Sequence, residues 1–193
     1  MVGELHIIIG PMFSSKTSYL INKYYTYRLK YDCILINHNS DTRYSNLRDK
    51  SSVITHNNLK ESAIMLKTLS SIEKTLYNNC NVLFIDEGNF FTDLKIFVIN
   101  AVENDNKIVF VTGLNGDYNR EKFGQLTDLI PYNNTLTFLT GLCHYCNDMT
   151  PSLFTLRLDK SNKNQISVGS SENYVSVCRK HFLMYSHQSN NDI

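Results

Sequence analysis

The chain has 193 residues, of which 42% are hydrophobic and 19% are charged, and its formal net charge is +1. This composition is typical of a globular protein with one domain, or one domain and a small appendage, and excludes a disordered chain. The near-neutral charge argues against a large basic surface for nucleic acid or an anionic membrane. No apolar segment approaches the roughly 18 residues of a membrane-spanning helix, and no signal peptide is evident. We therefore expect a cytoplasmic protein that binds neither nucleic acid nor membrane.

Strands and helices are expected to alternate along the first 116 residues. The run LHIIIG at 5–10 predicts a buried parallel strand, because a half-exposed strand would alternate polar and apolar residues. Further strands are expected at 33–39, 81–87 and 107–116, and helices at 16–29, 66–79 and 93–104. This order predicts an α/β fold, with a mostly parallel sheet flanked by helices and ligands at the carboxyl ends of the strands.

The segment GPMFSSKT at 10–17 joins the first strand to the first helix and has the pattern of a P-loop. In a P-loop, backbone N–H groups and the helix N-terminus hold phosphates. Lys16 would reach the outer phosphates, and the Thr17 hydroxyl would join the Mg²⁺ shell. The nucleotide-binding residues would be Gly10, Pro11, Met12, Phe13, Ser14, Ser15, Lys16, Thr17 and Ser18. The alternative is a surface turn that happens to contain Lys-Thr.

Ser15 stands where this motif usually has glycine, which tolerates a positive φ. A positive φ at serine would strain the loop. Because Lys16 and Thr17 are both retained, we expect that the loop has adapted, with a negative φ at Ser15 and its hydroxyl available to a phosphate oxygen.

Two carboxylates, Asp86 and Glu87, end the strand at 81–87. Acidic residues at the end of a strand beside a P-loop commonly address Mg²⁺ or the nucleophile. The two side chains point in opposite directions if strand geometry continues, so we expect different roles, one of which is to accept a proton from a hydroxyl. Of Phe90 and Phe91, one is expected to stack on a flat substrate and the other to lie in the core. For Asp86 and Glu87, the alternative to a functional role is a helix-capping Asp-Glu-Gly turn.

The helical pattern ends near residue 136. We expect a P-loop domain at 1–135, a small second domain at 136–183 and a flexible tail at 184–193. The second domain carries a C-x2-C pair and a C-x2-H pair, and this spacing predicts a closed, structural zinc site. The four ligands would be Cys143, Cys146, Cys178 and His181. The alternative is two unrelated pairs, and the remaining cysteines, Cys33 and Cys80, are interpreted as small hydrophobic residues.

The ordered set of motifs resembles the type II thymidine kinases, the zinc-bearing, tetrameric family of animals, bacteria and large DNA viruses. The resemblance covers about residues 4–181. Its motifs are GPMFSSKTS at 10–18, DTRYS at 41–45, IDEGNFF at 85–91, LNGDYNREKFG at 114–124, CHYC at 143–146 and NYVSVCRKH at 173–181.

The resemblance implies ATP-dependent phosphorylation of the 5′-hydroxyl of thymidine, and usually deoxyuridine, with Mg²⁺. It implies that Glu87 is the general base, that Lys16 and Arg157 act at the reacting phosphate, and that Asp41 and Asp86 lie near the magnesium with Thr17. It implies a base pocket and a lasso that reads thymine through backbone groups. These substrate residues would be Phe90, Leu114, Phe123, Gln165, Ile166, Ser167, Val168, Gly169 and Tyr174. A homotetramer and dTTP as a possible feedback ligand are implied as well.

The sequence departs from the family pattern at Ser15, Asn37, Asn89 and within the segment NGDYNR at 115–120. Because these departures cluster around the nucleotide, an alternative is a catalytically weak thymidine-nucleotide-binding protein of the same fold. A P-loop ATPase with a zinc ribbon that handles nucleic acid is a third hypothesis, which the near-neutral charge disfavours.

Overall fold

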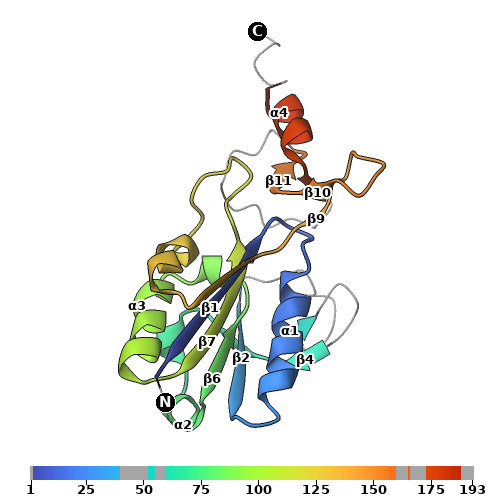
Figure 1. Ribbon diagram of the computed structural model, residues 1–193. Helices are drawn as coiled ribbons and strands as arrows, with labels where there is room; N and C mark the ends of the chain where they lie inside the picture. Colours follow the sequence, from blue (N-terminus) through green and yellow to red (C-terminus); the bar gives the residue numbers. More distant parts are fainter. Residues whose placement is uncertain (1, 40–51, 55–59, 160–164, 166–172, 188–193) are drawn as a thin grey trace.

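The computed structural model describes residues 2–39, 52–54, 60–159, 165 and 173–187. Its main body is a sheet with helices on both faces, which confirms the predicted α/β fold (Figure 1). The strand order is β5-β2-β6-β7-β1-β8, and every neighbouring pair is parallel. These strands are β1 (Glu4–Gly10), β2 (Cys33–His38), β5 (Ile64–Leu66), β6 (Val82–Ile85), β7 (Ile108–Leu114) and β8 (Thr135–Phe138).

Helices of the main body lie in all three segments where they were expected. They are α1 (Lys16–Tyr27), η1 (Leu69–Ser71), α2 (Lys74–Asn79), η2 (Gly88–Phe90), α3 (Leu94–Ile99), the π-helical η3 (Asn100–Asn104) and η4 (Leu126–Tyr132), of which η2 and η4 are additional. The single helix expected at 66–79 was wrong, because Leu66 ends β5 and only η1 and α2 follow. The Asp93 carboxylate accepts hydrogen bonds from the N–H groups of Leu69 and Ser70, and these bonds hold a short turn there.

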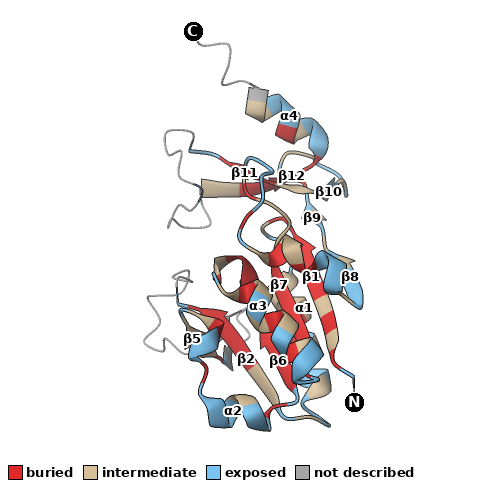
Figure 2. Cartoon of the chain, turned by 90° about the vertical axis from the view of Figure 1, so that its left-hand side faces the viewer, coloured by how far each residue is buried: buried red, intermediate tan, exposed pale blue. Residues whose placement is uncertain are grey.

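Each face of the sheet has its own apolar core. Ile7 and Ile9 of β1 pack in one cluster with Leu94 and Val98 of α3. Ile8, between them in sequence, packs in the other cluster with buried residues of α1. Buried residues accordingly make up all of β6 and most of β1 and β7, as Figure 2 shows. Such continuous burial explains why these strands read as unbroken apolar runs in the sequence.

After β8 the chain leaves the sheet and forms a small unit (residues 139–187), which lies beyond the carboxyl ends of the strands (Figures 1 and 2). Two antiparallel pairs and one helix build it. These elements are β9 (Gly141–Leu142), β10 (Pro151–Ser152), β11 (Phe154–Arg157), β12 (Tyr174–Val177) and α4 (Arg179–His187). A further antiparallel pair, β3 (Ser52–Ile54) and β4 (Lys60–Ser62), lies between β2 and β5 in sequence.

The main sheet and the small unit meet near the expected domain boundary. Since β8 is the edge strand of the main sheet, a boundary between residues 135 and 136 falls inside that strand. Helix α4 was not expected from the sequence, and it reaches His187, so it includes the start of the expected tail at 184–193. Residues 188–193 lie outside the described residues. None of the helices in the described ranges has the length and apolar character needed to cross a membrane.

Candidate active site

The predicted P-loop lies between the end of β1 at Gly10 and the start of α1 at Lys16. The expected negative φ of Ser15 was wrong: its φ is 59° and its ψ is 26°, in the left-handed region. Phe13 also has a positive φ, of 60°. The chain reverses from strand to helix within five residues, and it does so through these two left-handed residues. Ser15 thus takes the backbone conformation that glycine usually has at this position. This conformation costs a residue with a side chain about 1–2 kcal/mol.

Polar contacts within the loop close it around one carbonyl group. The buried Ser14 hydroxyl donates to the Pro11 carbonyl oxygen at 2.8 Å. The Lys16 ammonium donates to the same oxygen at 2.7 Å. A Cβ at Gly10 would lie 2.2 Å from the Leu139 carbonyl oxygen, so only glycine fits there. The loop therefore has the strand before it, the helix after it and the lysine position that a phosphate cradle requires.

A buried carboxylate joins the P-loop to the neighbouring strand ends. Asp86 is 2% exposed, and its Oδ2 accepts a hydrogen bond from the Thr17 hydroxyl at 2.9 Å. Its Oδ1 accepts from the Thr112 hydroxyl of β7 and, at 3.0 Å, from the Glu87 N–H. The structure thus brings together two of the three residues expected near magnesium, at the carboxyl ends of β6 and β7. The third, Asp41, lies outside the described residues.

The two adjacent carboxylates have different surroundings, but strand alternation is not the reason. β6 ends at Ile85, and Glu87 has a left-handed φ of 52° at the start of η2. The turn is packed tightly, because a Cβ at Gly88 would lie 2.7 Å from Val111 Cγ2. Asp86 is therefore buried beside α1, while Glu87 is half-buried beyond the carboxyl end of β6.

The two adjacent phenylalanines differ, as predicted, and one of them lies in the core. Phe91 is 1% exposed and belongs to the core. Phe90 contacts Phe123 edge to face, with ring centroids 5.4 Å apart. The His38 ring stacks on Phe90, with ring centroids 5.7 Å apart. Burial lowers the pKa of His38, so its ring is neutral near pH 7. His38 was not predicted as part of this site, since nothing in the sequence indicates that the end of β2 lies beside Phe90.

Arg157, predicted to act at the reacting phosphate, is a buried residue at the end of β11. Its guanidinium donates to the Tyr174 hydroxyl from Nε at 3.0 Å and from Nη2 at 2.6 Å, and to the Gln165 carbonyl oxygen at 3.3 Å. It also lies 3.7 Å from the centroid of the Tyr118 ring. Two predicted substrate residues, Tyr174 and Gln165, are thus held together by this arginine.

The loop from residue 115 to residue 122 contacts the start of the predicted lasso. The Gln165 side-chain amide donates to Asp117 Oδ2 at 2.9 Å and to the Lys122 carbonyl oxygen at 3.0 Å. The segment NGDYNR was identified from the sequence only as a departure from the family pattern, so the contacts of Asp117 with Gln165 and of Tyr118 with Arg157 were not predicted. The other predicted lasso residues, Ile166, Ser167, Val168 and Gly169, lie outside the described residues.

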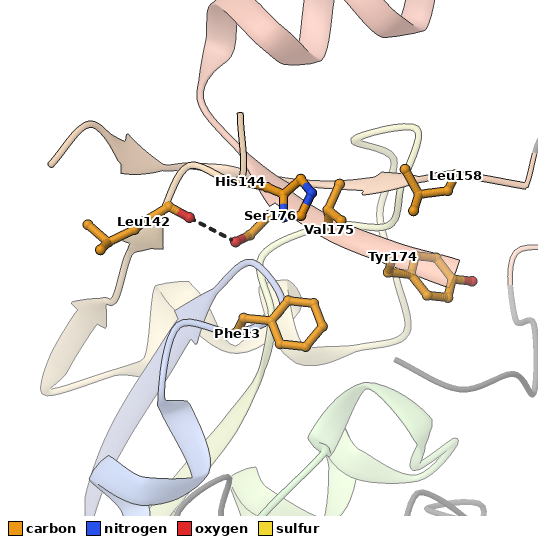
Figure 3. A pocket seen from close by; sticks show the side chains of 7 residues that line it. All are labelled: Phe13, Leu142, His144, Leu158, Tyr174, Val175 and Ser176. Carbon is orange, nitrogen blue, oxygen red and sulfur yellow. Dashed lines mark hydrogen bonds between the residues drawn. The ribbon is translucent and has the colours of Figure 1, made fainter. Parts of the chain in front are cut away.

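A pocket of about 490 Å³ lies between the P-loop and the small unit (Figure 3). Figure 3 shows the Phe13 ring directed from the P-loop toward β12. The lining residues are Phe13, Leu142, His144, Leu158, Tyr174, Val175 and Ser176. Tyr174 joins this pocket to the Arg157 contacts, whereas Phe90, Leu114 and Phe123 do not line it.

The four predicted zinc ligands come together in the small unit. His181 Nδ1 lies 3.4 Å from the Sγ of Cys143, 3.5 Å from that of Cys146 and 3.4 Å from that of Cys178. All four ligand atoms lie within 4.8 Å of one another. Ligands at about 2.0–2.3 Å from a tetrahedral ion are separated by about 3.5–3.8 Å, so this set can hold zinc.

The thiols of this cluster differ: hydrogen bonds favour the thiolate at Cys143, whereas burial and the neighbouring Cys143 raise the pKa of Cys146 to about 11. Burial alone would raise the pKa of Cys143, but the backbone N–H groups of Cys178 and Tyr145 outweigh it and lower that pKa to about 6. The Cys178 N–H donates to Cys143 Sγ at 3.2 Å. A thiolate is the form that binds metal, so Cys143 favours metal binding by its own environment.

Comparison with known proteins shows the family of this chain. The family model described as "Thymidine kinase" matches residues 3–182. The chain is 38% identical to a thymidine kinase of Oryza sativa subsp. japonica, in an alignment that covers 94% of this chain and 66% of the rice protein. It is 38% identical to the thymidine kinase of Fowlpox virus over 94% of this chain and 97% of the viral one. Thymidine kinase 1 of Dictyostelium discoideum is 32% identical over 93% of this chain and 77% of that protein. The chain therefore belongs to the thymidine kinase family.

Proposed function

We propose that this protein is a thymidine kinase that transfers the terminal phosphoryl group of ATP to the 5′-hydroxyl of thymidine, and also of deoxyuridine. The observation that carries the proposal is the contact of Thr17, at the start of α1, with the buried Asp86 at the end of β6. This contact brings the loop at residues 10–17 next to the carboxylate pair at the carboxyl end of β6, which supports a site for phosphoryl transfer. Phosphoryl transfer needs positioned phosphates, a cation and an oriented hydroxyl, and little covalent work from the protein.

The phosphates of ATP would lie on the backbone N–H groups of residues 10–18, with Lys16 at the outer phosphates. Thr17, Asp86 and Asp41 would hold a magnesium ion, which would neutralise the charge on the phosphates. In this proposal Asp86 is already ordered by Thr17 and Thr112, so the site needs little rearrangement to accept a cation.

Glu87 would accept the proton of the 5′-hydroxyl, because it follows Asp86 directly and precedes the aromatic residues that would hold the base. Phe90, Leu114, Phe123 and Tyr174 would line the base site, and the lasso from Gln165 to Gly169 would read the thymine edge through its backbone. Arg157 would act at the transferring phosphate. Its contacts with Tyr174 and Gln165 would join that role to closure of the lasso.

Further features of the assembly belong to the same proposal. Residues 1–135 would form the nucleotide-binding domain and residues 136–183 a zinc-stabilised lasso domain. The protein would act in the cytoplasm as a homotetramer, with dTTP as a feedback ligand.

Substitution of the proposed base tests this mechanism. Glu87→Gln keeps the shape of the side chain but cannot accept a proton, so kcat for thymidine with ATP and Mg²⁺ should fall by about 10²–10⁴-fold. Calorimetric affinities for ATP and thymidine should change by less than about threefold. Glu103→Gln, at an exposed position of η3, is the matched control and should keep wild-type turnover. Wild-type turnover in Glu87→Gln would remove Glu87 from the mechanism.

A further inference from the structure

Asn89 lies in η2, between the proposed base Glu87 and the aromatic Phe90, and only 4% of its surface is exposed. Its side-chain Oδ1 accepts a hydrogen bond from the Leu114 N–H at 2.6 Å. Its Nδ2 donates to the Phe123 carbonyl oxygen at 2.8 Å and to the Leu114 carbonyl oxygen at 3.2 Å. The amide oxygen and the amide N–H groups of Asn89 therefore all form hydrogen bonds with backbone groups at the two ends of one segment, from Leu114 to Phe123.

The glycines that flank this segment are fitted to Asn89. A Cβ at Gly113 would lie 2.0 Å from Asn89 Oδ1, and a Cβ at Gly124 would lie 2.1 Å from the Asn89 carbonyl oxygen. Both distances are far below van der Waals contact, so a side chain at either position would displace Asn89 or the segment. Close packing and hydrogen bonds thus both indicate that the segment from Leu114 to Phe123 is attached to the rest of the protein at Asn89.

The attached segment carries groups that the proposed function places at the nucleoside. Phe123, whose carbonyl accepts from Asn89, contacts Phe90 edge to face. Asp117, in the middle of the segment, accepts from the Gln165 amide. A shift of the segment would therefore move the aromatic pair and the lasso contact together.

We propose that Asn89 is a positioning residue for thymidine: its amide fixes the segment from Leu114 to Phe123, so that Phe90, Phe123 and the lasso contact are arranged before the nucleoside arrives. Asn89 acts through this segment and touches no substrate itself. The inference rests on the proposed function, because that function puts the thymine against these rings. A preorganised segment lowers the cost of ordering on binding, so its loss should appear in nucleoside affinity.

Lys107 provides a matched control at the opposite end of β7. It is 6% exposed, and its Nζ donates to the carbonyl oxygens of Tyr77 at 2.8 Å and Cys80 at 2.7 Å. Like Asn89, it is a buried polar side chain that ties backbone groups to the sheet, but it precedes β7 whereas Leu114 ends that strand. Loss of either side chain leaves buried polar groups without partners and lowers stability.

The experiment compares Asn89→Ala, Gly113→Ala and Lys107→Met with the wild-type protein, at a temperature where all are folded. We expect the KM for thymidine to rise by at least about tenfold in Asn89→Ala and Gly113→Ala, with kcat within about threefold and the KM for ATP within about twofold. Calorimetry should show the same weakening of thymidine binding without turnover. Lys107→Met should lower the melting temperature but leave both KM values unchanged.

If Asn89→Ala does not fold, Asn89→Asp tests the same hydrogen bonds. It keeps the shape and the acceptor for the Leu114 N–H, but it cannot donate to the two carbonyl groups, so thymidine affinity should again fall by at least about tenfold. An unchanged thymidine KM in both Asn89→Asp and Gly113→Ala would overturn the proposal. So would an equal rise in Lys107→Met, because Asn89 would then act only through stability. Failure of the wild-type protein to phosphorylate thymidine would instead contradict the proposed function, and thymidine calorimetry would still decide the role of Asn89.

Discussion

The six-stranded sheet and the small unit bury very different amounts of apolar surface. Among the described residues, the two clusters on the faces of the sheet contain 17 and 9 buried residues. The corresponding cluster of the small unit contains six, and Cys143 and Cys178 are two of them. At about 1.5–3 kcal/mol for each buried large apolar side chain, the sheet has enough core to fold without help. The small unit has far less core, so we expect its folding to depend on metal ligation.

The two regions are also joined by arginine–aromatic contacts on the substrate side. The Arg120 guanidinium, from the loop after β7, lies 4.6 Å from the centroid of the Phe182 ring, next to the ligand His181. The Arg157 guanidinium, from β11, lies over Tyr118 of that same loop. The small unit thus contacts the loop that leads to Phe123. We therefore expect loss of metal to disturb the proposed nucleoside site while the core of the sheet persists.

Removal of a zinc ligand should separate the two regions most strongly. In Cys146→Ser, the metal stoichiometry should fall from near one to near zero, because a structural zinc site supplies about 10–16 kcal/mol of folding free energy in small domains. We expect loss of thymidine turnover and rapid limited proteolysis within residues 139–187, with ATP affinity retained by the sheet. Cys33→Ser, in β2, is the matched control and should keep its zinc. Freshly purified, folded wild-type protein without zinc would contradict the site.

A large-to-small change in the core of the sheet should have the reverse effect. Phe84 is fully buried and stacks on Phe110 with ring centroids 4.9 Å apart. Phe84→Ala should cost about 3–5 kcal/mol and lower the melting temperature by roughly 6–20 °C, while zinc stays bound in the native state. Phe182→Ala, the same change in the small unit, should instead weaken zinc retention against a chelator. Equal zinc loss in the two variants would show that the regions fold as one.

The Asp93 contact should make the sheet sensitive to acid. Burial would raise the pKa of Asp93, but the N–H groups of Ser70 and Leu69 outweigh it, and the pKa is lowered. A lowered carboxyl pKa stabilises the folded state above the unfolded value of about 4, and this stabilisation is lost as the pH falls through the folded value. Because the carboxylate is partly screened by solvent, Asp93→Asn should cost roughly 1 kcal/mol at pH 7. Denaturant titrations should show that the difference from wild type shrinks below pH of about 4, with zinc content unchanged.

The smallest effect is expected at the P-loop. Ser15 has a left-handed backbone, so Ser15→Gly should stabilise the sheet by up to about 1 kcal/mol. ATP affinity should change by less than about tenfold, or roughly 1.4 kcal/mol, because the loop already has the glycine conformation. Asn106→Gly, at another residue of positive φ before β7, should give a similar gain in stability with no change in ATP affinity. A much larger gain in ATP binding in Ser15→Gly would show that the serine disables the loop.

Features that depend on nearby residues in sequence were predicted well. Unbroken apolar runs predicted the central strands, since a strand buried on both faces has no polar alternation. The strand–loop–helix context predicted the P-loop at Gly10–Thr17, and the two short cysteine motifs predicted which four residues come together. In each case the chemistry depends on residue type and short spacing.

Features that depend on distant contacts were not predictable in this way. The segment 66–79 has helical spacing, but the Asp93 carboxylate holds its first part in a turn. The expected negative φ of Ser15 failed because the loop reverses the chain directly between β1 and α1. Strand β8 lies beside β1 although more than a hundred residues separate them, so a change in sequence pattern near residue 136 did not mark the edge of the sheet.

The sequence by itself determined the fold class, the phosphate loop and the metal ligands, because local pattern and residue chemistry specify them. Tertiary structure alone decided that Asn89 attaches both ends of the segment from Leu114 to Phe123, and that Arg157 lies between Tyr118 and Tyr174. An amide or a guanidinium can satisfy its hydrogen bonds with many partners, and only the packing of distant strands and loops selects which ones it meets.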